Sequence, residues 1–328
     1  MTDTVEQTLP ADVDVVESND PRDGLLFGRF YVDDRTRYIV KQLFTRPTSV
    51  IGLLIILGFA MVALLAPVLA PPANRGNPYT IPRDGFRSTP RTPSDEHIFG
   101  TTEGQYDLYY GIIWGTRTAF RVGLVVTGIT LVVGLVVGSV AGYYGGVIDD
   151  VLMRIVEIVM AFPFLLAAIT LAAVLRASVT TGIAAAMIAL IAFGWPTYAR
   201  LIRGEILTIK ERDFVLAAKA VGATDFYILL RYVLPNAIFP TLVVASMDIG
   251  SYVLSFAALS FLGLGAEPGY ADWGQLISFA RNWIPALDRY PHIILYPGVA
   301  ILLFVMGWNL VGDAFRDIID PRLSGSRG

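Results

Sequence analysis

The sequence predicts an all-α, polytopic integral membrane protein with six transmembrane helices. Of its 328 residues, 54% are hydrophobic and only 16% are charged, whereas soluble proteins carry about 25% charged residues. The apolar residues form runs of roughly 20 residues, the length that a helix needs to cross the hydrocarbon of a bilayer. Backbone polar groups cannot stay unsatisfied in lipid, and the sequence lacks the alternating pattern of a membrane β-barrel, so these runs are expected to be helices.

The chain before the first run divides into two expected segments. Residues 1–24 are acidic, unlike the basic start of a signal peptide, and we expect them to form a disordered tail. Residues 25–46 mix apolar and aromatic side chains with basic ones, which favours an amphipathic helix lying at the membrane interface. A solvated linker is the alternative for this second segment.

A six-helix membrane domain is expected over residues 47–322, followed by a short tail, 323–328. Its predicted spans lie near residues 48–71, 120–146, 153–176, 178–200, 234–264 and 291–313. With the N-terminus inside, loops on that side hold about twice as many Lys and Arg residues as loops on the other side. This bias predicts that both termini are cytoplasmic and that the long first loop, up to residue 117, faces outward.

Composition excludes several classes of function. The chain has no cysteine and only two histidines, His97 and His292, so disulfides and thiolate sites are excluded and a histidine-based metal cluster has little room. The net charge of −3 argues against nucleic-acid binding. The sequence holds no G-x-x-x-x-G-K-[ST] phosphate loop. We therefore predict no catalytic, cofactor or metal residue on this chain and no enzymatic activity.

The segment between the fourth and fifth predicted spans is the most informative. Residues 200–231 are charged, yet apolar residues run through them, which a merely solvated loop would not need. Asp213 is a suitable N-cap and Gly222 a suitable stop, so we expect a short helix over about 213–224. An exposed helix with one apolar face indicates a partner groove.

The same segment carries a resemblance to a known family. The residues Leu216, Ala217, Ala218, Gly222, Tyr232, Val233, Leu234 and Pro235 keep the spacing of Glu-Ala-Ala, three residues, Gly, nine residues and Ile-x-Leu-Pro. This pattern resembles the loop signature of ATP-binding-cassette (ABC) importer permeases. Leu216 stands where glutamate is usual, and Tyr232 stands where isoleucine is usual.

Three further motifs resemble the C-type permease subunits of dipeptide and oligopeptide importers. They comprise residues 259–266 with Asp272-Trp273-Gly274, residues 309–317 with Asp320-Pro321-Arg322, and the group His97, Gly100, Thr101, Asp107, Gly115 and Arg117. The resemblance covers about residues 46–322 and implies the type I ABC importer permease architecture in a cell membrane. In the third motif, Thr102, Gln105 and Tyr106 depart from the usual residues.

The resemblance also implies partners and roles. Leu216, Ala217, Ala218, Gly222, Leu234 and Pro235 would couple this chain to two separate ATP-binding subunits, which would hold ATP and Mg²⁺. A second homologous permease subunit would complete the translocation pathway in the lipid bilayer, and an extracytoplasmic binding protein would deliver the substrate. Peptides are the substrate this branch implies, with nickel, glutathione and oligosaccharides left open.

Asp248 is the candidate residue for the translocation path, because it is the one acidic residue well inside an apolar run. The alternative is a protonated or hydrogen-bonded aspartate packed among Ser246, Ser251 and backbone carbonyls. A transporter or channel that works without ATPases is the competing function, although it would be expected to carry several intramembrane charges. A membrane-embedded enzyme is a third, and the catalytic groups it would need are not visible.

Two packing predictions complete the sequence analysis. Gly134, Gly138 and Gly142 recur at four-residue spacing, which indicates a stripe for close helix contact. Arg154 and Glu157 are one helical turn apart, which predicts a structural ion pair.

Overall fold

The computed structural model describes residues 46–74, 76–178 and 181–319. The chain divides into two compact units, residues 1–42 and 43–328, and all that follows concerns the second. The expected tail 1–24, nearly all of the interfacial segment 25–46, and the C-terminal tail 323–328 lie outside the described residues.

The described residues are mainly helical, with three isolated β-bridges in place of strands. The long helices are α2 (Pro47–Leu69), α3 (Leu108–Tyr144), α4 (Gly146–Met160), α5 (Phe164–Arg176), α6 (Gly182–Ile209), α9 (Leu234–Phe261) and α11 (His292–Ile319). The short ones are α7 (Asp213–Ala220), α8 (Asp225–Ile228), a π-helical turn (Leu229–Val233), α10 (Trp273–Ser278) and a 3-10 helix (Arg281–Ala286). Within the described part of the chain, five helices are long and apolar enough to cross a membrane, or six if α4 and α5 count as one bent span. The all-α prediction is confirmed.

The second helix begins well before the predicted residue 120. Asp107 caps the start of α3, because its Oδ1 accepts a hydrogen bond from the backbone N–H of Tyr110 at 2.8 Å. Arg117 had suggested a boundary, but the Nε of this residue donates to the backbone carbonyl of Ala63 on α2. Its guanidinium also lies 5.0 Å from the centre of the Trp114 ring. A partnered cation of this kind does not end a helix.

The third predicted span, 153–176, is not one straight helix. Helices α4 and α5 meet at an angle of 83° across residues 161–163. Pro163 explains the break, because proline has no backbone N–H to donate and disfavours helical geometry in the residue before it. The prediction missed this bend because it counted apolar residues and gave Pro163 no weight.

The helices of the fourth and fifth predicted spans both extend into the segment predicted to be a loop. The fourth is α6, and the fifth, called the fifth helix, ends as α9. Helix α6 continues nine residues past Arg200 to Ile209. Asp149 of α4 holds it there, since both of its carboxylate oxygens accept from Arg203, each at 2.5 Å. The fifth helix is continuous from Asp225 to Phe261, through α8, the π-helical turn and α9. Residues 200–231 are therefore mostly helical.

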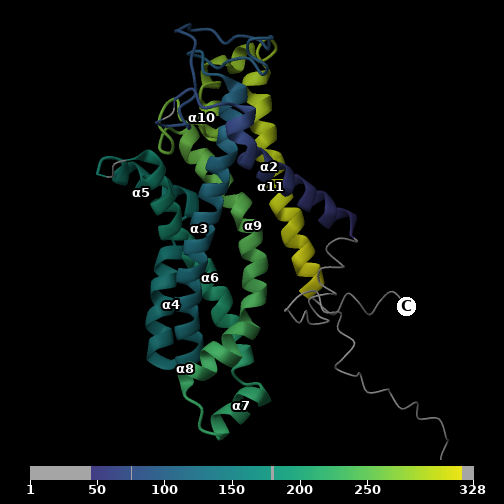
Figure 1. The fold of residues 1–328 in the computed structure, drawn as a ribbon. Helices are drawn as coiled ribbons and strands as arrows, with labels where there is room; N and C mark the ends of the chain where they lie inside the picture. Colours follow the sequence, from purple (N-terminus) through teal and green to yellow (C-terminus); the bar gives the residue numbers. More distant parts are fainter. Residues whose placement is uncertain (1–45, 75, 179–180, 320–328) are drawn as a thin grey trace, which may run out of the picture. The chain divides into compact units, whose positions relative to one another are not determined.

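Helix α3 lies at the centre of the packing and makes its most extensive contact with α6 (Figure 1). The predicted glycine stripe makes close helix contact, and its partner is α6: a Cβ atom built on Gly134 would lie 2.8 Å from the carbonyl oxygen of Trp195. The Arg154–Glu157 ion pair is also confirmed, at 3.2 Å on the surface of α4. Helices α9 and α2 pack along α11.

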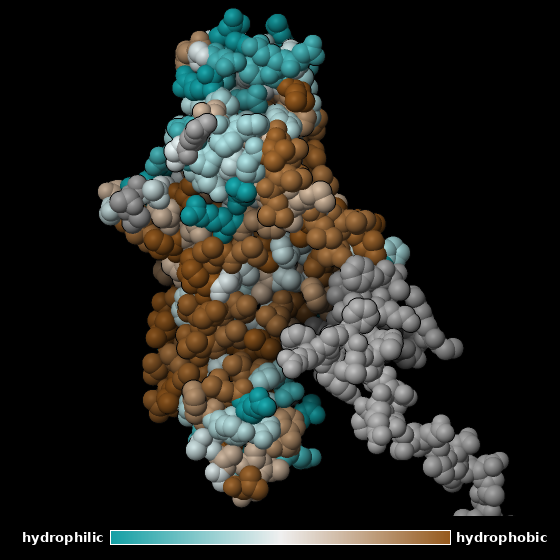
Figure 2. All heavy atoms as spheres, viewed as in Figure 1, coloured by the Kyte–Doolittle hydropathy of each residue, from teal (hydrophilic) through white to brown (hydrophobic). Residues whose placement is uncertain are grey.

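The surface divides into an apolar belt and two more polar ends. Figure 2 shows hydrophobic residues over the middle of the helices, with hydrophilic residues gathered at the end that carries the long first loop. The opposite end carries α7 and α8 and mixes polar with apolar residues. This distribution fits a protein surrounded by lipid at its middle.

Candidate functional site

Helix α7 forms the tip of the polar end opposite the long first loop (Figure 1). Asp213 is its first residue rather than its cap, because Arg212 occupies the N-cap position without a side-chain hydrogen bond. The acid still suits the positive end of the helix dipole. Gly222 stops the helix as expected, with φ at +83°, and a Cβ atom added there would meet nothing within 4 Å. The turn closes with the backbone N–H of Ala223 donating to the carbonyl of Ala218.

One face of α7 is buried against its neighbours. Val215 is fully buried and Ala218 is nearly so. Both belong to a cluster with Ile202 and Ile206 of α6 and with four residues of the fifth helix, Ile228, Leu229, Val233 and Ala237. Helix α7 therefore shares one buried apolar cluster with α6 and with the fifth helix, which runs from Asp225 to Phe261.

Polar contacts hold this assembly to the end of α3. The hydroxyl of Tyr143 donates to Asp225 Oδ1 at 2.9 Å, and Lys210 Nζ donates to the carbonyl of Gly142 at 3.0 Å. The ammonium of Lys219 lies 5.7 Å from the centre of the Tyr143 ring. Three long helices and α7 thus meet within one small volume.

The other face of α7 is apolar and exposed. Among its side chains Phe214 is 44% exposed and Leu216 is 47% exposed, while Val221 just beyond the helix is 84% exposed. Phe226 of α8, the next helix along the chain, is 66% exposed. Several large apolar side chains exposed at the polar end of a membrane protein indicate a protein contact.

The residues singled out in this segment occupy three different environments. Leu216, Ala217 and Gly222 are exposed at the tip, whereas Ala218 belongs to the buried face. Leu234 and Pro235 begin α9 directly after the π-helical turn, and Pro235 is exposed. Because proline has no N–H, it cannot donate the α-helical hydrogen bond to the carbonyl of Arg231, which lies in that turn. The structure brings the first four together, and Leu234 packs against the same buried cluster as Ala218.

A membrane cavity of about 490 Å³ lies among the α4–α5 break, α6 and α9. Its lining combines apolar side chains, including those at the α4–α5 break, with the polar residues Thr197, Asp248, Ser251 and Ser255. The bend at Pro163 therefore forms part of the cavity wall. Concave sites that are mostly apolar and carry a few convergent polar groups are typical of ligand pockets.

Asp248 lines this cavity, but its partner differs from the two expected serines. Asp248 Oδ2 accepts a hydrogen bond at 2.7 Å from the hydroxyl of Tyr198 on α6, a side chain that is fully buried. Ser246 instead donates to the carbonyl of Val243, and Ser251 lines the cavity beside Asp248. The sequence carried no signal for Tyr198, because pairing 50 positions apart depends on how α6 and α9 pack.

The comparisons with known proteins agree with this arrangement. Residues 134–325 match the family described as "Binding-protein-dependent transport system inner membrane component", and residues 35–83 match the "N-terminal TM domain of oligopeptide transport permease C". The dipeptide transport system permease protein DppC of Alkalihalophilus pseudofirmus is 36% identical over 287 residues, which are 88% of this chain and 90% of the relative. The glutathione transport system permease protein GsiD of Escherichia coli is 38% identical over 71% of this chain and 75% of its own.

A solved structure shares the fold. The inward-facing MetNI methionine ABC transporter aligns with a TM-score of 0.52 and 22% sequence identity, covering 64% of this chain and 97% of the transporter chain. At this identity, the likeness supports the fold alone.

The family match and the similar transport proteins place this chain among the membrane permease subunits of ABC importers. Such a subunit is not an enzyme, since separate ATPase subunits hydrolyse ATP in these importers. The chain belongs to the family of binding-protein-dependent transport system inner membrane components and matches the C-type permeases of the dipeptide and oligopeptide branch. This membership makes it a multi-pass inner-membrane protein and sets aside the ATPase-independent transporter.

Proposed function

We propose that this chain forms half of the translocation pathway for di- or oligopeptides and is coupled to two ATPase subunits through α7. The single observation that carries the coupling is the double environment of α7. Its inner face belongs to one buried apolar cluster with α6 and the fifth helix, and its outer face exposes Phe214 and Leu216. A partner protein that binds the outer face of α7 would move α6 and the fifth helix together.

The remaining assignments follow from the same family. A second, related permease completes the pathway, and an extracytoplasmic protein delivers the substrate to it. Residues 47–322 form the permease domain, and both termini are cytoplasmic. The excess of Lys and Arg on the α7 side supports this orientation.

The coupling role is tested with Gly222→Asp. A Cβ atom there meets nothing, so the substitution adds charge at the tip and strains a positive φ without disturbing the buried face. We expect the variant to assemble with its partners but to lose peptide uptake driven by ATP. Gly204→Asp is the matched control, because Gly204 of α6 is exposed and equally open, so the same charge is added away from the α7 tip. Unchanged uptake by Gly222→Asp in an assembled complex would contradict the coupling role.

The cavity supports a role for Asp248 in the pathway. We propose that its carboxylate binds the N-terminal ammonium of a peptide, while Thr197 and Ser251 offer hydrogen bonds nearby. The expected result for Asp248→Asn is slower uptake of a peptide with a free N-terminus and little change for its N-acetylated form. Ser246→Ala is a control, because the Ser246 hydroxyl is bound to its own helix backbone. Equally slowed uptake of both peptides would show that Asp248 does not bind the N-terminal ammonium.

A further inference from the structure

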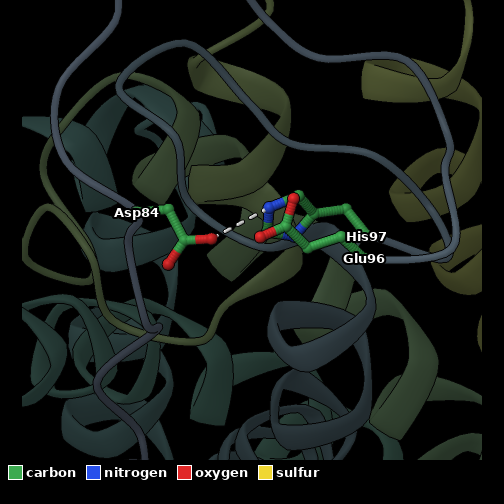
Figure 3. A group of neighbouring side chains, drawn as sticks. All are labelled: Asp84, Glu96 and His97. Atoms are coloured by element: carbon green, nitrogen blue, oxygen red, sulfur yellow. Dashed lines mark ion pairs between the residues drawn. The ribbon is translucent and has the colours of Figure 1, made fainter.

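A second grouping of polar residues lies in the long first loop, far along the chain from α7. The side chains of Asp84, Glu96 and His97 converge there (Figure 3), and one potential ligand atom from each lies within 4.8 Å of the others. Figure 3 shows Asp84 pointing at the imidazole from one segment of the loop, while Glu96 and His97 come from another. The sequence analysis predicted no metal site because the chain has only two histidines. Composition does not show which side chains lie close together in the folded chain.

His97 is the observation that points to a ligand. Its side chain is buried, with 6% of the residue exposed, and Nε2 is buried without a hydrogen-bond partner. That nitrogen faces Asp84 Oδ2 at 3.1 Å. Ligand atoms around a tetrahedral zinc ion are about 3.3 Å apart, given metal–ligand distances of about 2.0–2.2 Å. The spacing of this pair fits a shared ion.

Asp107 fixes the imidazole from the other side. Its Oδ2 lies 2.8 Å from His97 Nδ1, while its Oδ1 caps α3. A carboxylate at Nδ1 retains the proton on that nitrogen and leaves the Nε2 lone pair free to bind a metal. The lone pair is then directed towards Asp84, so the loop already holds the ring in the orientation that metal-binding histidines require.

We propose that Asp84, Glu96 and His97 bind one Zn²⁺ ion. One imidazole and two carboxylates suit zinc, whereas Ca²⁺ and Mg²⁺ prefer oxygen ligands alone. Glu96 can complete the set because its side chain is 73% exposed, although it lies 3.7 Å from Arg91 and must leave that cation. Three protein ligands leave a fourth position for water. The ion would tie residue 84 to residues 96–97 and, through Asp107, to the start of α3.

The test is zinc binding by the full-length chain, purified in detergent and stripped with a chelator. Calorimetric titration with ZnCl₂ is expected to show one saturable site per chain. Asp84→Asn and Glu96→Gln should each weaken binding at least tenfold, and both positions are exposed enough for the fold to tolerate the change. Asp95→Asn is the matched control, since Asp95 is an exposed acid of the same turn outside the group.

Two results would overturn the site. The first is the absence of saturable zinc uptake, which would leave His97 with only its protein partners, Asp84 and Asp107. The second is wild-type zinc affinity in Asp84→Asn. Cobalt substitution gives an independent readout, because Co²⁺ bound by the three ligands would absorb visible light and Asp84→Asn should reduce that absorption.

Discussion

Replacing Gly138 by alanine should destabilise the protein by forcing α3 and α6 apart. A Cβ atom at this position would collide with the backbone carbonyl oxygen of Ala199 and with the side chain of Ile202. The carbonyl belongs to the helix backbone and cannot rotate away. Overpacking of this kind costs about 1–3 kcal/mol, against a gain of up to about 1 kcal/mol for replacing a helical glycine. We expect a net loss of about 1–2 kcal/mol.

Gly128 provides the matched control on the same helix. It is exposed, and a Cβ atom there would meet nothing within 4 Å, so Gly128→Ala should raise stability slightly or leave it unchanged. Gly142→Ala should fall between the two, because its Cβ atom would lie 3.1 Å from the carbonyl of Arg203. Gly128→Ala is therefore expected to be the most stable of the three variants, Gly142→Ala intermediate and Gly138→Ala the least stable.

Thermal unfolding in detergent, followed by tryptophan fluorescence, measures this order. The midpoint for Gly138→Ala should fall below that of the wild type, while that of Gly128→Ala should not. If Gly138→Ala were as stable as Gly128→Ala, then the close α3–α6 contact would not stabilise the protein.

Three further predictions concern polar side chains. Asp149→Asn should cost about 2 kcal/mol by leaving Arg203 without its carboxylate, whereas Glu157→Gln, in an exposed pair, should cost well under 1 kcal/mol in the same unfolding assay. Burial raises the pKa of Asp272 to about 6 from 3.8. Between pH 4 and 6 the folded protein therefore binds more protons than the unfolded protein. The free energy of unfolding should fall by up to about 3 kcal/mol as pH rises through that window. Unfolding midpoints measured across that range should lose this slope in Asp272→Asn, and retention of the slope would assign it to another group. Tyr198→Phe should slow peptide uptake without preventing assembly with the ATPases, because it removes only the hydroxyl that binds the aspartate of the membrane cavity.

The sequence was sufficient to predict an all-α membrane fold, because the length of each apolar run can be counted from the sequence alone. It predicted helix boundaries less well where they depend on the tertiary contacts of a charged residue or on a proline. Arg117 seemed to end a span, but its guanidinium is satisfied by α2 and Trp114. Arg203 seemed to lie in a loop, but Asp149 holds it on a continuing helix. In both cases, the partner that removes the cost of the charge lies about 54 residues away in sequence.

The candidate site was predictable where spacing carries the information. Asp213 and Gly222 located a short helix over about 213–224, which the structure places at Asp213–Ala220 with Gly222 in the turn after it. The partner of Asp248 was not predictable, since Tyr198 stands in an apolar run with nothing to mark it. The convergence of Asp84 on His97 was equally hidden, because it depends on the path of a loop.

The continuous helix from Asp225 to Phe261 has a geometric consequence for transport. Its part α9 begins at Leu234, and Asp248 lies about 21 Å along that helix at 1.5 Å per residue. A tilt of about 15° about the start of α9 would displace the Asp248 backbone by about 5 Å, roughly the height of one helical turn. A small rotation imposed on the tip is therefore enough to change which side chains face the membrane cavity.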